Sequence, residues 1–258
     1  MNTIVIKIGG SSFGKRDPIL EDLVELQKKG QSMVVVHGGG NVVTEWLKKQ
    51  NIPTTFVRGE RVTDLPALEM VTAVLGGLMN KLIVGTINAL GGRAVGISGV
   101  DGALIQAKIA KEELGYVGVT AKVDATVLEA LLKAGFIPVV SPISFYAVGR
   151  PAGAPPMLNI NGDPLAGEIA AAIKAERLIF LSDVDGILDK AGKRIAHLNS
   201  IQAKELIDSG TASDGMIPKI NGCLTALAAG TKSCIVDGRQ PHALVTAVEK
   251  PGGGTVIE

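Results

Sequence analysis

The chain is poor in aromatic residues, in cysteine and in net charge. Aromatics make up 3 % of its 258 residues, which argues against a platform on which nucleic-acid bases stack. Its 26 basic and 25 acidic side chains leave a net charge of +1, so it has no electrostatic footprint for nucleic acid or an anionic membrane. Cys223 and Cys234 match no metal or disulfide pattern, and we expect two packed thiols in a reducing cytoplasm.

Targeting segments and long apolar runs are also missing. Met1 leads almost at once into an apolar strand, without the basic region or cleavage site of a signal peptide. No uninterrupted apolar run reaches the roughly 18 residues that a membrane-spanning helix needs, so we expect no membrane partner. The hydrophobic share of 46 % is nevertheless too high for a disordered chain. A folded protein with one large core is therefore expected.

Short β-branched runs alternate with helical patterns along the chain. We expect strands at residues 3–8, 33–36, 94–97, 137–140, 178–181 and 233–236. We expect helices over residues 18–29, 42–49, 66–90, 125–134, 165–175, 201–209 and 219–229. This alternation predicts a single α/β domain over residues 1–258, a three-layer αβα sandwich with a mainly parallel central sheet. Ligands of such sheets bind beyond the carboxyl ends of the strands.

Glycine is abundant, and it gathers where the first two predicted strands end. These strands end in Lys7-Ile8-Gly9-Gly10-Ser11-Ser12 and in His37-Gly38-Gly39-Gly40-Asn41. Glycine lets backbone N–H groups approach an anion closely, and the dipole of the helix that follows adds to the attraction. Two such loops on neighbouring strands, with Lys7 inside the first strand, favour a site for a phosphorylated ligand over two plain turns. Neither loop is a Walker loop or a dinucleotide fingerprint, because Arg16 and Val43 replace residues that those motifs need.

The second half of the chain carries polar groups in apolar surroundings. In Asn159-Ile160-Asn161-Gly162-Asp163, the last residue could cap the helix that follows. The turn at Ser182-Asp183-Val184-Asp185-Gly186 is compatible with a nucleotide contact and with a plain entry into a hairpin. Lys219 stands at the start of a helix, where the dipole disfavours a cation, and this suggests an anion nearby. We expect no structural metal site, since the three histidines, at positions 37, 197 and 242, share no ligand spacing.

In their order and spacing these motifs resemble the amino acid kinase superfamily, most closely the N-acetyl-L-glutamate kinases. Further motifs that carry the resemblance are Arg58-Gly59-Glu60-Arg61-Val62-Thr63, Asn80-Lys81 and Gly215-Met216-Ile217-Pro218-Lys219. The resemblance spans essentially the whole chain and implies the amino acid kinase fold. The implied activity is ATP-dependent phosphorylation of the γ-carboxylate of N-acetyl-L-glutamate to N-acetyl-L-glutamyl 5-phosphate, in arginine biosynthesis. An approximate N-lobe of residues 1–173 would bind the acyl amino acid, and an approximate C-lobe of residues 174–258 the nucleotide.

The same resemblance implies a role for each site residue. Lys7 and Lys219 would stabilise charge on the transferring phosphoryl group, and Asp163 would hold and orient both lysines. The remaining substrate site would comprise Gly10 and Gly39 as backbone donors, Arg61 paired with the α-carboxylate, and Gly40 and Asn159. The nucleotide pocket would be lined by Asp183, Val184, Asp185, Gly186, Ile187, Leu188, Thr211, Ala212 and Ser213. Mg²⁺ would be carried mostly by the phosphates of ATP, without a metal site on the protein.

Two alternatives remain open at this point. Gly162 stands where the usual motif of the family has alanine, and this keeps open an acceptor glutamate or aminoadipate that is linked to a carrier protein. A sensor that has lost phosphoryl transfer would lack one of the two lysines or Asp163, and all three are present. No catalytic histidine is needed in either kinase, because a carboxylate is already a nucleophile at pH 7. We expect a homodimer, without the N-terminal helix that links dimers into hexamers in arginine-inhibited relatives.

Overall fold

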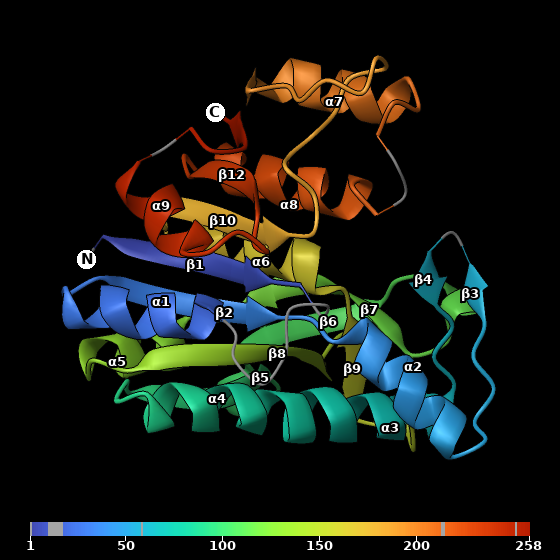
Figure 1. Cartoon of the computed structure of the whole chain (residues 1–258). Coiled ribbons are helices and arrows are strands. Elements are labelled where there is room, and N and C mark those ends of the chain that lie inside the picture. The colour runs from blue at the N-terminus through green and yellow to red at the C-terminus, as the bar shows by residue number, and fades with distance from the viewer. Residues whose placement is uncertain (1, 10–17, 58, 213–214, 251) are drawn as a thin grey trace.

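The computed structural model describes residues 2–9, 18–57, 59–212, 215–250 and 252–258 (Figure 1). Its main sheet has eleven strands in the order β11-β13-β12-β10-β1-β2-β8-β6-β7-β9, and β5 pairs with β8. The strands are β1 (Thr3–Ile8), β2 (Ser32–His37), β5 (Ala94–Gly99), β6 (Ile105–Ile109), β7 (Val117–Val123), β8 (Ile137–Tyr146), β9 (Met157–Ile160), β10 (Arg177–Ser182), β11 (His197–Leu198), β12 (Lys232–Asp237) and β13 (Thr255–Ile257). Two further short strands, β3 (Phe56–Val57) and β4 (Glu60–Arg61), form a separate hairpin.

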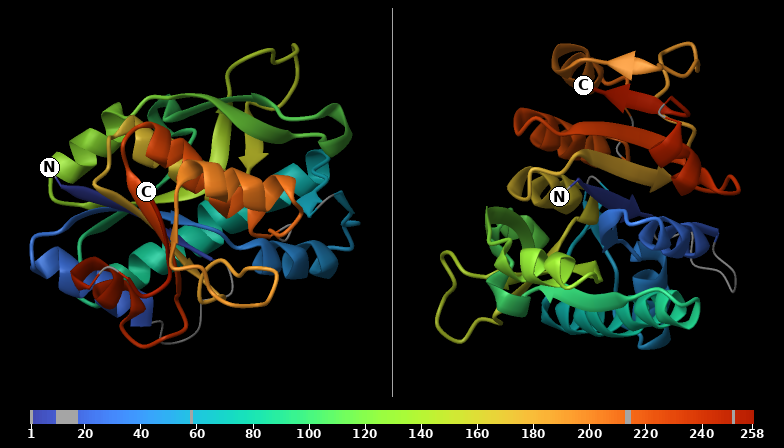
Figure 2. Two further views of the ribbon diagram at one scale, coloured as in Figure 1. Left: turned by 90° about the horizontal axis from the view of Figure 1, so that it is seen from above. Right: turned by 90° about the vertical axis from the view of Figure 1, so that its left-hand side faces the viewer.

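The helices lie on both faces of this sheet, which gives the three layers that the sequence predicts (Figure 2). They are α1 (Pro18–Lys28), α2 (Gly40–Lys49), α3 (Leu65–Val71), α4 (Asn80–Ala89), α5 (Thr126–Lys133), α6 (Gly162–Ala172), α7 (Ser200–Asp208), α8 (Ile217–Ala228) and α9 (Ala243–Glu249). Strand β1 shows why both faces are covered. Its Ile4 and Ile6 pack into one core with α1, α4 and α9, whereas Val5 packs into the other with α5, α6 and α8. A strand buried on both faces needs the continuous apolar run that identified it in the sequence.

The order of the central strands places their carboxyl ends at one edge of the sheet. In Figure 1 this order runs downward from β12 through β10, β1 and β2 to β8, and each of these neighbours is paired in parallel. The N–H of Gly9 donates to the carbonyl of Leu181 at 3.3 Å, and the N–H of Gly38 donates to that of Ile8 at 3.0 Å. The two glycine loops therefore begin side by side, as expected for neighbouring strands.

A long helical segment, Leu65–Ala89, crosses the lower part of the molecule in Figure 1. It matches the helix expected over residues 66–90, but its middle, Thr72–Met79, is a π-helix between α3 and α4. By length and composition alone this segment could cross a membrane. Its Ile83 and Ile87, however, belong to the core beneath β1. We therefore interpret it as a core helix of an α/β fold.

The strands and turns around residue 110 were not expected from the sequence. Strands β6 and β7 form an antiparallel hairpin, and β9 pairs antiparallel with β8 and parallel with β7. The loop between β8 and β9 covers residues 147–156, because β8 continues to Tyr146 and β9 begins at Met157. Residues 187–196 form a hairpin, in which the N–H of Asp189 donates to the carbonyl of Lys193 at 2.8 Å. Pairing within the sheet is otherwise parallel, apart from β12 with β13.

Candidate active site

Two lysines from opposite ends of the chain meet on one buried carboxylate. Lys7 lies in β1, Asp163 in the first turn of α6 and Lys219 in the first turn of α8. The amine of Lys7 is ion-paired with Oδ1 of Asp163, and Nζ of Lys219 lies 3.2 Å from Oδ2. Burial by itself would raise the pKa of Asp163, but the charges and hydrogen bonds of Lys7 and Lys219 hold that pKa below its usual value. The carboxylate thus stays ionised and fixes the direction of both amines.

Asp163 is not the helix cap that the sequence suggested it could be. The N-cap of α6 is Asn161, whose side chain accepts a hydrogen bond from the N–H of Asp163 at 3.0 Å. A carboxylate inside the first turn is still favoured by the helix dipole. Because Asn161 takes the capping role, both oxygens of Asp163 are available to the two lysines.

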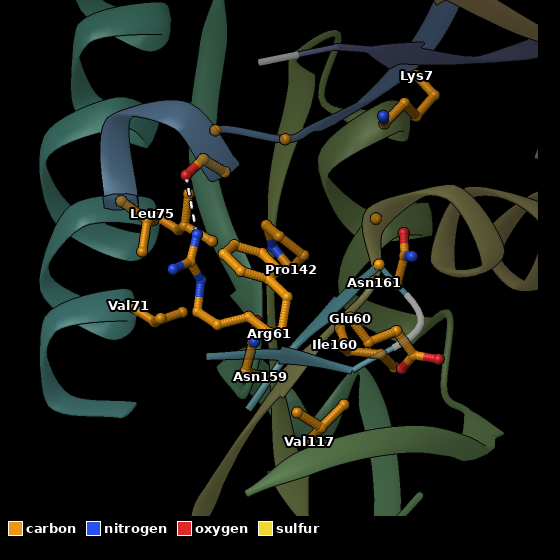
Figure 3. A pocket seen from close by; sticks show the side chains of 17 residues that line it. Lys7, Glu60, Arg61, Val71, Leu75, Val117, Pro142, Asn159, Ile160 and Asn161 are labelled. Carbon is orange, nitrogen blue, oxygen red and sulfur yellow. Dashed lines mark hydrogen bonds between the residues drawn. The ribbon is translucent and has the colours of Figure 1, made fainter. Parts of the chain in front are cut away.

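A cavity of about 270 Å³ opens beside Lys7 (Figure 3). Lys7 lies at one end, and Arg61 and Asn159 lie at the other. Its remaining lining comes mainly from the glycine loop at residues 38–40, the β3–β4 hairpin, the long helix, the strands β7, β8 and β9, and the start of α6. The cavity is thus of small-metabolite size and has a cation at each end.

Arg61 is held in place on one side and is unpartnered on the other. Its Nη2 donates to the carbonyl of Gly40 at 3.1 Å and to the hydroxyl of Thr44 at 2.8 Å, and its guanidinium lies 4.7 Å from the ring centre of Phe56. Its Nη1 is buried and finds no hydrogen-bond partner among the described residues. Burial lowers the pKa of Arg61, and an unpaired buried donor costs free energy. A planar carboxylate in the cavity would accept a hydrogen bond from Nη1 and would also stabilise the positive charge of the guanidinium.

Two threonines in this region were not identified from the sequence. Thr44 orients Arg61, and the hydroxyl of Thr63 accepts a hydrogen bond from Nδ2 of Asn159 at 3.2 Å. The available signal was spacing, since Thr44 is one helical turn beyond Gly40 and Thr63 is two strand positions beyond Arg61. Threonines at such spacings are too common for the sequence alone to identify a functional one, so the folded structure is needed.

The second glycine loop presents backbone donors to the same space. Gly39 is the N-cap residue of α2, which has no side-chain cap, and its φ of 148° favours glycine. A Cβ on Gly39 would lie 2.7 Å from Cδ2 of Leu75. The N–H groups of Gly39 and Gly40 have no hydrogen-bond partner in the described parts of the chain. The start of this ten-residue helix is therefore suited to an anion. Gly10, predicted to do the same in the first loop, lies outside the described residues.

A second cavity, of about 220 Å³, shares Lys7 and Gly40 with the first. Lys219, Asn41 and Asp183 also line it. Lys7 therefore borders both cavities, and the carboxylate-bound lysine pair stands where they adjoin. The arrangement suits transfer of an anionic group from a donor in the second cavity to an acceptor in the first.

Of the residues predicted for the nucleotide pocket, only some lie beside the second cavity. Asp183 lines the second cavity, but Asp185 is ion-paired with Arg194 at 2.9 Å. The side chain of Ile187 is in the hydrophobic core, together with Ala212. Thr211 lines a separate cavity between the 187–196 hairpin and α7. Leu188 is exposed, and Ser213 lies outside the described residues. The turn at Val184 and Gly186 joins the strand end to this hairpin.

A parallel α/β sheet with two glycine loops, and two lysines converging on one carboxylate, defines a phosphotransferase of small anionic substrates. The chain belongs to the amino acid kinase family, whose model matches residues 2–237.

Named relatives and solved structures agree with this assignment. The chain is 46 % identical over 254 residues to an acetylglutamate kinase of Dehalococcoides mccartyi (strain CBDB1), covering 98 % of this chain and 93 % of the relative. It is 42 % identical over 265 residues to that of Caldanaerobacter subterraneus subsp. tengcongensis, covering 99 % and 87 %. A solved structure of a protein from Streptococcus mutans UA159 matches with a TM-score of 0.85 at 28 % identity, over 99 % and 98 % of the two chains.

Proposed function

We propose that this chain transfers the γ-phosphoryl group of ATP to the γ-carboxylate of N-acetyl-L-glutamate, in arginine biosynthesis. The products are N-acetyl-L-glutamyl 5-phosphate and ADP. One observation carries the proposal: the cavity has Lys7, ion-paired with Asp163, at one end and the unpartnered Nη1 of Arg61 at the other. This spacing of cations suits an acceptor with a carboxylate at each end. The names of the relatives, acetylglutamate kinases at 42–46 % identity, support the same acceptor.

The transfer requires positioning and charge neutralisation. An oxygen of the γ-carboxylate attacks the γ-phosphorus, the bond from that phosphorus to the β,γ-bridging oxygen breaks, and ADP leaves with the electron pair. No proton moves, because the nucleophile is already ionised. Lys7 and Lys219 would balance the charge that spreads over the phosphoryl oxygens, and Gly39 would donate its N–H to one of them. Asp163 would keep the two amines at a fixed separation throughout.

The acceptor would be held at its far end by the other predicted residues. Arg61 would pair with the α-carboxylate, which would satisfy the guanidinium nitrogen that has no partner among the described residues. Asn159 would contact the acyl amino acid from β9, and Gly40 from the start of α2. A molecule held at both ends presents its γ-carboxylate beside Lys7.

Mg²⁺ fits this site best as an ion carried by the phosphates of ATP. The described residues that line the second cavity include one carboxylate, Asp183, and two cations, Lys7 and Lys219. Mg²⁺ keeps several waters and binds through phosphates and one or two carboxylates. When bound, it would neutralise charge on the phosphates. The phosphates of the nucleotide would lie in the second cavity, beside Asp183 and Lys219.

A substrate panel with ATP and Mg²⁺ tests the proposal. N-acetyl-L-glutamate, glutamate, aspartate, N-acetylaminoadipate and carrier-linked glutamate would be compared by ADP release and by trapping of the acyl phosphate. We expect turnover with N-acetyl-L-glutamate to exceed that with every other acceptor. Preference for a carrier-linked acceptor would contradict N-acetyl-L-glutamate as the acceptor, but phosphorylation of a carboxylate would remain the reaction class. Nucleotide binding without any product would favour a sensor.

We also propose that the protein is a cytoplasmic homodimer. Leu78 and Leu82 are exposed on the outer side of the long helix, next to β5, for which the described residues provide one neighbour. An apolar helix face beside an open strand suits a second copy of the chain. Light scattering is expected to give twice the 26.6 kDa of one chain, and Leu82→Arg is expected to halve that mass. A monomeric wild type would contradict the proposal.

A further inference from the structure

Beneath the second glycine loop lies a buried polar chain that the proposed mechanism does not use. His37 and Asn80 are both buried, at 0 % and 1 % exposure. Nδ1 of His37 lies 2.8 Å from the carbonyl oxygen of Gly38, and its Nε2 lies 3.4 Å from Nδ2 of Asn80. Nζ of Lys81 donates to Oδ1 of Asn80 at 3.1 Å. The groups form one continuous chain from the surface of α4 to the loop.

The hydrogen bonds along this chain permit only one direction. A carbonyl only accepts, so Nδ1 of His37 must carry the proton that faces Gly38. Lysine only donates, so the oxygen of the Asn80 amide faces Lys81 and its nitrogen faces His37. The same nitrogen donates to the carbonyl of Val139 at 2.9 Å, which fixes the amide a second time. The imidazole is therefore held as a single neutral tautomer. Burial and the charge of Lys7 lower the pKa of His37 to about 4, against the opposing effect of the hydrogen bond to Gly38.

The hydrogen bond from His37 fixes the orientation of the peptide group between Gly38 and Gly39. In a trans peptide the C=O and the next N–H point in opposite directions. Holding the carbonyl of Gly38 on the buried imidazole turns the N–H of Gly39 away from it. Gly39 lines the cavity and has a φ that favours glycine. Because it has no side chain, packing of its own side chain cannot fix the direction of its N–H. Glycine loops otherwise have more conformational freedom than other segments.

We propose that His37 is a positioning residue of the phosphotransfer site, and that Lys81 and Asn80 hold it in the tautomer that aims the Gly39 N–H at the reacting group. The inference rests on the proposed function, in which that N–H serves as a donor. It also gives a role to the Asn80-Lys81 motif, which lies outside both cavities.

Substitutions at His37 separate its two ring nitrogens. His37→Asn places an amide N–H near the position of Nδ1, whereas His37→Gln places one near Nε2. We expect kcat to fall on the order of 10- to 100-fold in His37→Gln and markedly less in His37→Asn, with KM for ATP nearly unchanged. Equal losses in the two variants would indicate a merely structural role and overturn the proposal.

A second variant reaches the chain from outside the site. A Cβ on Gly96 would overlap Oδ1 of Asn80 and lie 2.8 Å from Nζ of Lys81. Gly96→Ala should therefore lower kcat about tenfold without touching a residue of either cavity. Gly253→Ala is the matched control, because a Cβ there meets nothing within 4 Å. A wild-type kcat in folded Gly96→Ala would contradict the proposed role of the hydrogen bonds from Lys81 through Asn80 to His37.

Nitrogen NMR of histidine-labelled protein tests the tautomer without any substrate. The signals of His197 and His242 are identified with His197→Gln and His242→Asn, which leaves that of His37. We expect a neutral imidazole protonated at Nδ1, with altered protonation in Gly96→Ala. A wild-type His37 protonated at Nε2 refutes the proposal even where variants do not fold. If the wild type does not phosphorylate N-acetyl-L-glutamate, the proposed function fails, and the NMR result still decides the tautomer.

Discussion

Gly167 of α6 lies directly against Gly222 of α8. A Cβ on Gly167 would come within 2.7 Å of Cα of Gly222, and one on Gly222 would lie 2.7 Å from the carbonyl oxygen of Asp163. The two helices therefore approach backbone to backbone. This approach brings the amine of Lys219, on α8, to the carboxylate of Asp163, on α6.

Gly167→Ala is expected to push these helices apart. Overpacking at a close contact costs about 1–3 kcal/mol of unfolding free energy, and kcat should fall because Lys219 moves from Asp163. Thermal unfolding and steady-state kinetics measure the two effects. Gly77→Ala is the control, since a Cβ there meets nothing within 4 Å. Wild-type stability and kcat in Gly167→Ala would contradict the close packing.

Removing either lysine should slow the chemical step. We expect kcat to fall at least about 100-fold in Lys7→Ala and Lys219→Ala, with a modest change in KM, because each amine acts on charge that develops during transfer. Lys133→Ala, at an exposed position, is expected to behave as wild type. An unchanged kcat in either active-site variant would remove that lysine from the mechanism.

Arg61→Lys should weaken binding of the acceptor more than transfer. A lysine keeps the charge but loses the fork of donors that pairs with a planar carboxylate. We expect KM for N-acetyl-L-glutamate to rise roughly 10- to 100-fold, with KM for ATP near wild type. Initial-rate kinetics with each substrate varied in turn measure both constants. A rise confined to KM for ATP would place Arg61 in the nucleotide site.

Gly162→Ala is expected to be tolerated. A Cβ on Gly162 would lie 3.4 Å from the carbonyl oxygen of His37 and 3.7 Å from Cε of Lys7, which are ordinary contacts. Alanine also favours the helix that begins there, by about 0.5–1 kcal/mol. Wild-type kinetics with a raised melting temperature would show that Gly162 does not mark a different acceptor. A changed preference in the acceptor panel would show the opposite.

His242 should make stability depend on pH. Its hydrogen bond to Asp22, at 2.8 Å, and the charge of that buried carboxylate raise the pKa of His242 above its usual 6.5. This stabilisation is fully present below about pH 6.5 and is lost as the pH rises through the raised pKa. Urea unfolding should therefore show a steeper loss of stability in the wild type than in His242→Asn as the pH rises above about 6.5.

His197→Gln controls for the general effect of losing a histidine. Nδ1 of His197 lies 3.7 Å from Oε1 of Glu258, at an exposed position, so the variant should keep the wild-type pH dependence. Asparagine suits position 242 because the backbone there is left-handed, with a φ of 53°. Identical pH profiles for wild type and His242→Asn would contradict the role of the Asp22 pair.

The elements that carry the site were predictable because their signals are local. Strands β1 and β2 are mostly apolar and are each followed by glycine, and both the fold class and the pairing of these strands are confirmed. The π-helical turn at Thr72–Met79 was not predicted, because its apolar pattern is that of a helix of either kind. Strands β6 and β7 include charged residues on an exposed face, which weakens the apolar signal of a strand.

The convergence of side chains could not be obtained from spacing. Lys7 and Lys219 meet because α6, which packs on β1, also lies closely against α8, which is a property of packing between distant segments. The resemblance to a family implied this pairing, whereas the residues alone indicated only two cations that need an anion. Thr44 and His37 act through one neighbour each, and only the folded backbone shows which neighbour that is.

The position of β1 in the sheet has a consequence for synthesis on the ribosome. Its neighbour β2 follows within a few tens of residues, but its other neighbour, β10, spans Arg177–Ser182. Until that segment emerges, one edge of β1 has no partner strand. Open strand edges promote association between chains. The nascent protein therefore passes through an interval in which this edge is open to association with other chains.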